Sequence, residues 1–178
     1  FWFTHPLTTE RMSEARLRAN QLPAVKPKLN DQDFEIIKWY SRVLSRQTSE
    51  EQLSLMNRQN NFAGQLALAA YQIQQSDFQA AQAALDQAKK HNQMHPLLVL
   101  FQTDIYLGQN QLNAALKSVA SAARIMPENR ALNYKYAEVL IRAQQPDQAK
   151  QIVQEFLNAN SRDVSGWRLM QLATNAEP

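Results

Sequence analysis

The sequence predicts an all-α fold, built as a solenoid of stacked helical hairpins. Three alanines, Ala81, Ala115 and Ala149, stand 34 residues apart, each within an apolar run at helical spacing. An aliphatic side chain follows four residues after each alanine, at Leu85, Val119 and Val153. A period of this length is typical of stacked hairpins, and because one hairpin alone buries too little apolar surface, neighbouring hairpins must pack on one another.

The chain begins with two segments that precede the repeats. Residues 1–21 are predicted to contain a helix capped by Thr8 or Thr9. Residues 22–29 contain two prolines, which end this helix and stiffen what we interpret as a linker. We therefore expect a domain boundary in the linker and assign residues 30–178 to the solenoid.

The solenoid itself divides into five parts by its hydrophobic pattern. A hairpin off the repeat pattern comes first, with its second helix capped by Thr48 or Ser49. Trp167 and Met170 repeat the opening apolar positions once more, which predicts a final helix that covers the last hydrophobic face. The parts are an atypical hairpin at 30–61, repeats at 62–95, 96–129 and 130–163, and a capping helix at 164–178.

These repeats resemble the tetratricopeptide repeat. The second repeat carries the family's residue types at Thr103, Tyr106, Leu112, Ala115, Val119, Ala122 and Pro127. The third departs at Pro146, where an aromatic residue is usual, and at Phe156, where a small one is usual. Proline is tolerable there as the first residue of a helix. The resemblance implies a right-handed solenoid in which the first helix of each hairpin lines a concave face.

The concave face is the candidate binding site that this resemblance implies. It is mostly apolar with two acids, and its predicted members are Leu66, Ala70, Ile73, Leu97, Leu100, Phe101, Asp104, Leu107, Tyr134, Glu138, Ile141 and Arg142. Members of the tetratricopeptide family that bind the acidic C-terminal tails of cytosolic chaperones need Lys and Asn where Leu66 and Ala70 stand. We therefore reject such tails as partners. An apolar groove suits an extended or partly folded polypeptide.

Two alternatives stay open for this face. Its apolar side chains either line an open groove or are sealed within the core by adjacent helices. Asp104 and Glu138 should instead face water or a basic partner, because unpaired acids are rarely buried.

The first residues carry a second resemblance. The run from Phe3 to Met12, with Thr-His-Pro at its start, is similar to the end of HExxH zinc metallopeptidase domains. Such a tail, followed by a proline linker and a tetratricopeptide array, resembles a family of periplasmic metallopeptidases of membrane-protein quality control. The resemblance implies that residues 1–21 end an upstream protease domain, and that this domain holds the zinc while the present chain binds no cofactor.

The same resemblance implies the partners and the location. They are outer-membrane β-barrel proteins, the machinery that assembles them, and the protease domain itself, all in the periplasm. We expect a protein-interaction module that serves chaperoning or degradation. The alternative is a structural arm that docks on the protease domain and regulates it, or fixes it in a complex.

Catalysis by the chain itself is the third possibility, and the residues argue against it. His91 and His95 stand four residues apart without an acid between them, so a solvated turn is favoured over a metal site. The sequence has no cysteine and no G-x-S-x-G motif, and its three glycines cannot form a phosphate-binding loop.

Composition excludes two further classes. The net charge is +3, but Lys and Arg are spread singly along the helices, which argues against a nucleic-acid surface. No apolar run of 18 residues occurs, so no membrane-spanning helix is expected. The chain begins with Phe1 and without a signal-like segment, so we expect it to be part of a longer protein.

Overall fold

The structure, a computed structural model, describes residues 50–177 except for the side chains of Met56 and Gln59. The chain divides into two units, residues 1–30 and 31–178, and every described residue belongs to the second. The predicted helix after Thr8, the linker and the first helix of the atypical hairpin lie outside the described residues.

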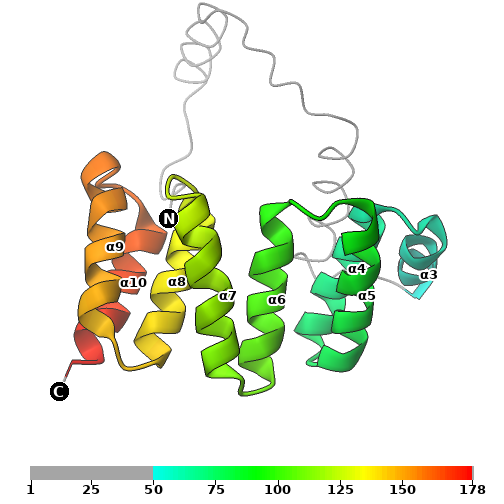
Figure 1. Ribbon diagram of the computed structural model, residues 1–178, viewed down its shortest axis with the longest axis horizontal. Helices are drawn as coiled ribbons and strands as arrows, with labels where there is room; N and C mark the ends of the chain where they lie inside the picture. The colour runs from blue at the N-terminus through cyan, green and yellow to red at the C-terminus, as the bar shows by residue number, and fades with distance from the viewer. Residues whose placement is uncertain (1–49, 178) are drawn as a thin grey trace, which may run out of the picture. The chain divides into compact units, whose positions relative to one another are not determined.

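The described residues form eight α-helices and no strand, which confirms the predicted all-α solenoid (Figure 1). In chain order they are α3 (Glu50–Gln59), α4 (Phe62–Gln74), α5 (Phe78–His91), α6 (Pro96–Gly108), α7 (Leu112–Ile125), α8 (Arg130–Arg142), α9 (Pro146–Ala159) and α10 (Val164–Asn175). Successive helices from α4 onward run in opposite directions (Figure 1). In this view α5 lies in front of α4, and α9 lies in front of the helix that follows it, α10.

The repeat period also sets the helix starts. The residues that cap α4, α6, α8 and α10 stand 34 apart, at Asn61, His95, Asn129 and Asp163. The Asn61 side chain accepts a 2.7 Å hydrogen bond from the Gly64 N–H, and Asn129 accepts one of 3.0 Å from Leu132. Because the first N–H groups of a helix have no partner within it, such side chains fix where the first helices begin.

The turns inside the hairpins follow the same period. Ser76, Asn110 and Gln144 have φ angles of 58°, 57° and 60°, in the left-handed region. One such residue per turn reverses the chain between the paired helices. In the third hairpin α9 then begins at Pro146, where a missing N–H costs little.

The alanine positions form the contact between paired helices. Ala81, Ala115 and Ala149 are fully buried, and the aliphatic residues one turn later, such as Leu85, are buried beside them. Small residues let the two backbones approach while the larger ones fill the adjacent space. This is the packing that the sequence pattern predicts.

Each first helix also contacts the first helix of the next hairpin. The pairs are α4 with α6, α6 with α8, and α8 with α10. These helices therefore form one continuous surface, which we call the first-helix face. It is the surface on which the predicted groove residues stand.

The last helix lies very close to the hairpin before it. A Cβ atom on Gly166 would stand 2.5 Å from the Tyr134 hydroxyl and 2.8 Å from a methyl group of Leu157. Only glycine allows this approach, since real Cβ atoms do not come so near to other heavy atoms. α10 thus packs against both α8 and α9 and covers the end of the array, as the capping position predicts.

Candidate peptide-binding face

Four predicted groove residues are buried, so the core alternative applies to them. Leu66 is 2% exposed, and Ala70 and Phe101 share its cluster between α4, α5 and α6. Tyr134 is 9% exposed and lies in the cluster of α8, α9 and α10. These side chains hold neighbouring helices together and offer little surface to a partner.

The remaining apolar candidates are half-buried and belong to three separate clusters. Ile73, Leu97 and Leu100 pack against the cluster that contains Leu66. Leu107 packs against the core of α7, and Ile141 packs against the cluster of Tyr134. The first-helix face therefore presents a series of partly covered apolar side chains.

Charged side chains form a connected row across α6 and α8. The Lys135 ammonium donates to Asp104 at 2.8 Å and to Glu138 at 3.1 Å. The Arg142 guanidinium donates to the other carboxylate oxygen of Glu138 at 3.3 Å. We call these four residues the charged row. It brings together three residues that were predicted for the groove, and of the two expected surroundings of the acids, water or a basic partner, Lys135 provides the second.

The row is partly shielded from solvent, and its central charge is stabilised. Burial lowers the pKa of Lys135, but the negative charges of Asp104 and Glu138 and their hydrogen bonds outweigh it, so the pKa is raised. Lys135 therefore stays charged at any physiological pH. Signs alternate along the row, acid to base to acid to base, and its net charge is zero.

A second polar network ties α8 to α10. The Tyr134 hydroxyl donates to the Asp163 carboxylate at 2.7 Å, and the Arg130 guanidinium donates to the same oxygen at 2.9 Å. The Arg130 guanidinium also lies 5.7 Å from the centre of the Tyr134 ring, and this ring makes a T-shaped contact with Phe156. Tyr134 is therefore a structural residue, with its hydroxyl satisfied inside the fold.

This network changes the acidity of both partners. Burial raises the pKa of Asp163, but the hydrogen bond from Tyr134 and the charge of Arg130 outweigh it, so the pKa is lowered. Burial and the neighbouring carboxylate raise the pKa of Tyr134. Asp163 is thus ionised, and Tyr134 keeps its proton, at neutral pH.

Sequence reasoning missed Lys135 and Asp163. Lys135 stands three residues before Glu138, a spacing that pairs side chains on one helix. Asp104 and Glu138 occupy the same position in consecutive repeats, and Lys135 stands one helical turn before that position. Asp163 occupies the same repeat position as the caps Asn61 and Asn129, so a search for caps at this period would have found it.

The two histidines have separate surroundings among residues 50–177. His91 is the exposed last residue of α5, whereas His95 caps α6 and accepts a 3.2 Å hydrogen bond at Nδ1 from the Leu97 N–H. The His95 ring also stacks at a tilt on Phe62, with 5.3 Å between ring centres. Within residues 50–177, no three His, Cys, Asp or Glu side chains are grouped closely enough to bind a metal ion.

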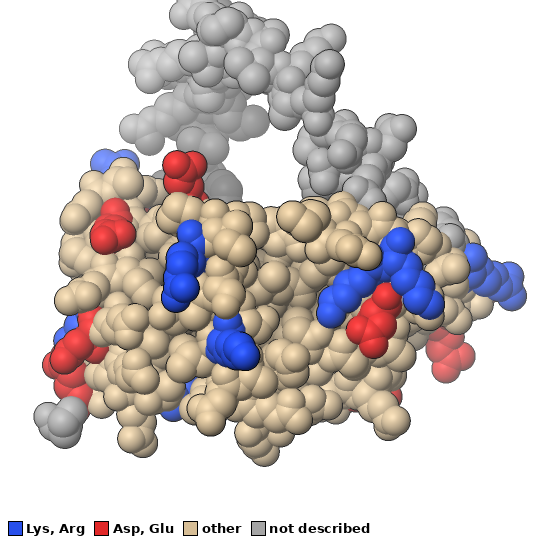
Figure 2. Space-filling view, in the orientation of Figure 1, with Lys and Arg blue, Asp and Glu red and all other residues tan. Residues whose placement is uncertain are grey.

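The opposite surface is formed by the second helices. Figure 2 shows Lys and Arg in separate groups on a largely uncharged face. No helix among the described residues is long and apolar enough to cross a membrane.

Comparison with known proteins agrees with this geometry. The family described as Tetratricopeptide repeat matches residues 106–173, from the last turn of α6 into α10. A beta-barrel assembly-enhancing protease of Yersinia pestis is 30% identical over 187 residues, covering 96% of this chain and 36% of that protein. The protein of the same name in Escherichia coli K12 is 27% identical over 180 residues, covering 97% and 37% respectively. The chain thus spans about a third of the length of these relatives.

Proposed function

Because this tetratricopeptide-type solenoid is similar over almost its whole length to beta-barrel assembly-enhancing proteases, we propose that it is the polypeptide-binding module of such a protease. Its clients are outer-membrane β-barrel proteins and components of their assembly machinery, which it holds for chaperoning or degradation in the periplasm. The zinc and the catalytic residues belong to a protease domain outside this sequence.

The observation that carries the proposal is the charged row with the half-buried side chains beside it. Asp104 and Glu138 stand on consecutive first helices, bridged by Lys135, while Leu107 and Ile141 lie one turn further along the same helices. Apolar side chains of an extended polypeptide can rest on Leu107 and Ile141. Its amide groups can bond to the row, which supplies both donors and acceptors.

The chemistry of the row suits a client of mixed composition. A site that clamps a carboxylate needs unbalanced positive charge, whereas this row is neutral and selects neither acidic nor basic segments. Each partly covered apolar contact is weak, which favours release of the client. We therefore expect binding that depends little on salt.

The test is the affinity of the 178-residue chain for an unfolded outer-membrane β-barrel polypeptide, measured by fluorescence anisotropy. Arg142→Glu removes the ion pair with Glu138 and leaves the row negative, so we expect about fivefold weaker binding. Lys117→Glu makes the same charge change at an exposed site on α7 and should have no effect.

Two results would contradict the proposal. Equal weakening by both variants would mean that net charge matters and the face does not. Unchanged binding in Arg142→Glu, with its helical content retained by circular dichroism, would favour a structural arm that contacts the protease domain elsewhere.

A further inference from the structure

The connections from one hairpin to the next all lie at one end of the array, which we call the junction end. Figure 1 shows the α5–α6, α7–α8 and α9–α10 connections on the same side of the described helices. The connecting residues are 92–95, 126–129 and 160–163. Because the helices alternate in direction, the turns inside the hairpins lie at the opposite end, at residues 75–77, 109–111 and 143–145.

Large apolar side chains are exposed mainly at the junction end. Six of them are exposed in the described part of the chain, and four of these belong to the junction end, namely Met94 (87% exposed), Ile125 (78%), Trp167 (50%) and Val164 (39%). The other two lie in α3 and in the second half of α10. The described turns at the opposite end contain only polar residues and one alanine. Such an unequal distribution needs a physical reason, since single exposed apolar residues would otherwise be scattered.

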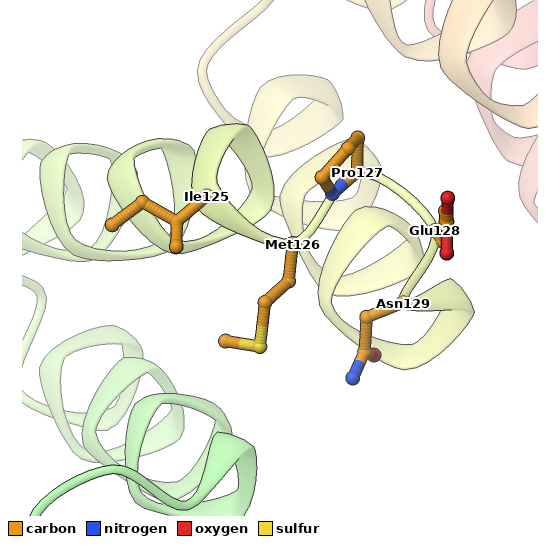
Figure 3. Close-up of a pocket in the computed structure, with 5 residues that line it drawn as sticks. All are labelled: Ile125, Met126, Pro127, Glu128 and Asn129. Carbon is orange, nitrogen blue, oxygen red and sulfur yellow. The ribbon is translucent and has the colours of Figure 1, made fainter.

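Basic side chains accompany these apolar residues. Lys90, Arg124, Arg162 and Arg168 are exposed near these apolar residues, and none of the four has an ion pair within residues 50–177. The exposed acid of the α7–α8 connection, Glu128, projects to a different side from Ile125 (Figure 3). Asp163 is buried and paired with Arg130, so it does not offset the positive charge.

The apolar side chains project from fixed backbone. The Asn133 amide donates to the carbonyl oxygens of Pro127 at 3.2 Å and of Asn129 at 2.8 Å, which fixes the α7–α8 connection. The Trp167 indole N–H donates to the Ser161 carbonyl at 2.8 Å and so holds the ring over the α9–α10 connection. Because this backbone is already fixed, little conformational entropy is lost when these side chains bind to another surface.

We propose that the junction end binds the surface of an anionic phospholipid bilayer. A bilayer interface accepts separate apolar side chains without shape complementarity, and it attracts the basic residues beside them. Tryptophan is favoured at the level of the lipid headgroups because its ring is apolar and its N–H is polar.

A protein partner fits the junction end less well. A stable protein interface needs apolar anchors in a well-packed, desolvated centre. Among residues 50–177, the hollow at the α7–α8 connection is lined by the five consecutive residues Ile125 to Asn129 (Figure 3), so the described apolar side chains there come from a single connection.

The experiment is co-sedimentation of the 178-residue chain with vesicles. One set contains phosphatidylglycerol and phosphatidylethanolamine, and the other contains phosphatidylcholine alone. We expect partition into the anionic set only, weakened by salt. Met94→Ser with Ile125→Ser, and separately Lys90→Gln with Arg124→Gln, should each lower the partition coefficient about tenfold.

Matched variants separate this end from the rest of the surface. Leu172→Ser removes an exposed apolar side chain from the second half of α10, and Lys117→Gln removes an exposed charge from α7. Both should partition as the unaltered chain does. A blue shift of tryptophan emission on vesicle addition, smaller in Trp167→Phe, would place that ring in the interface.

Several outcomes overturn the proposal. They are equal partition into both vesicle sets, no partition into either, or no loss in the junction-end variants. If vesicles do not retain the chain, but immobilised polyglutamate retains it and fails to retain Lys90→Gln with Arg124→Gln, the junction end recognises an acidic protein and the membrane proposal is wrong.

Discussion

The first-helix face is apolar and mostly closed at α4, whereas at α6 and α8 it also carries charged side chains and is more open. At the fifth repeat position, Leu66 is buried, Leu100 is half-buried, and Tyr134 is buried with its hydroxyl bonded to Asp163. At the ninth position a buried alanine in α4 is replaced by acids in α6 and α8, which Lys135 joins.

This difference teaches that repeat position sets the direction of a side chain but not its accessibility. The same position faces the same neighbouring helices in every repeat. Whether those helices cover it depends on the residues they contribute. Only the α6–α8 part of the face therefore offers both apolar and charged groups to a partner.

The largest expected effect separates two leucines at one repeat position. Leu66→Ala removes a buried side chain and should lower the free energy of unfolding by about 3 kcal/mol. Leu100→Ala removes a half-buried one and should cost about 1 kcal/mol. Urea unfolding followed by circular dichroism measures both, and equal losses would remove the distinction between the closed and open parts.

The network at the end of α8 should give the next largest effect. Asp163→Ala leaves the buried Tyr134 hydroxyl without its acceptor, so we expect a loss of about 2 kcal/mol in the free energy of unfolding. Glu155→Ala, an exposed acid on α9, is the control and should change stability little. A similar small change in both variants would show that the network does not hold α10.

The Asp163 carboxylate should make the free energy of unfolding depend on pH. Its pKa is lowered in the folded chain, so its contribution is fully present above the usual value of 3.8 and is lost as pH falls through the lowered value. The stability advantage of the unaltered chain over Asp163→Asn should be constant from pH 7 to about pH 5 and shrink below about pH 4. Urea midpoints across this range measure it, and an advantage that shrinks above pH 5 would contradict the assignment.

Sequence alone predicted most of the fold because its causes are local. The period of Ala81, Ala115 and Ala149 determines how paired helices pack, and the structure adds caps at Asn61 and Asn129 that follow the same period. These signals act within a few residues or one repeat, so one sequence contains them in full.

The candidate site could be predicted only in part. The register placed Asp104, Glu138 and Arg142 on the first-helix face, and the structure joins them through Lys135. The burial of Leu66 and Tyr134 depends on side chains from neighbouring helices, and this information is not local. Exposure therefore had to come from the structure.

A smaller effect is expected within the charged row. Lys135→Met leaves the carboxylates of Asp104 and Glu138 without their shared partner and should cost about 1 kcal/mol. A double-mutant cycle with Asp104→Asn should give a coupling of about 0.5 kcal/mol. Zero coupling would mean that the row does not connect α6 to α8 energetically.

Site-specific photo-crosslinking tests the central claim most directly. Benzoylphenylalanine is placed in turn at Glu138 and Arg142 on the first-helix face and at Lys117 on α7, and the chain is irradiated with the unfolded β-barrel polypeptide. We predict crosslinks from the two first-helix positions and none from Lys117. Crosslinks from Lys117 alone, or equally from all three positions, would contradict binding at the α6–α8 part of this face.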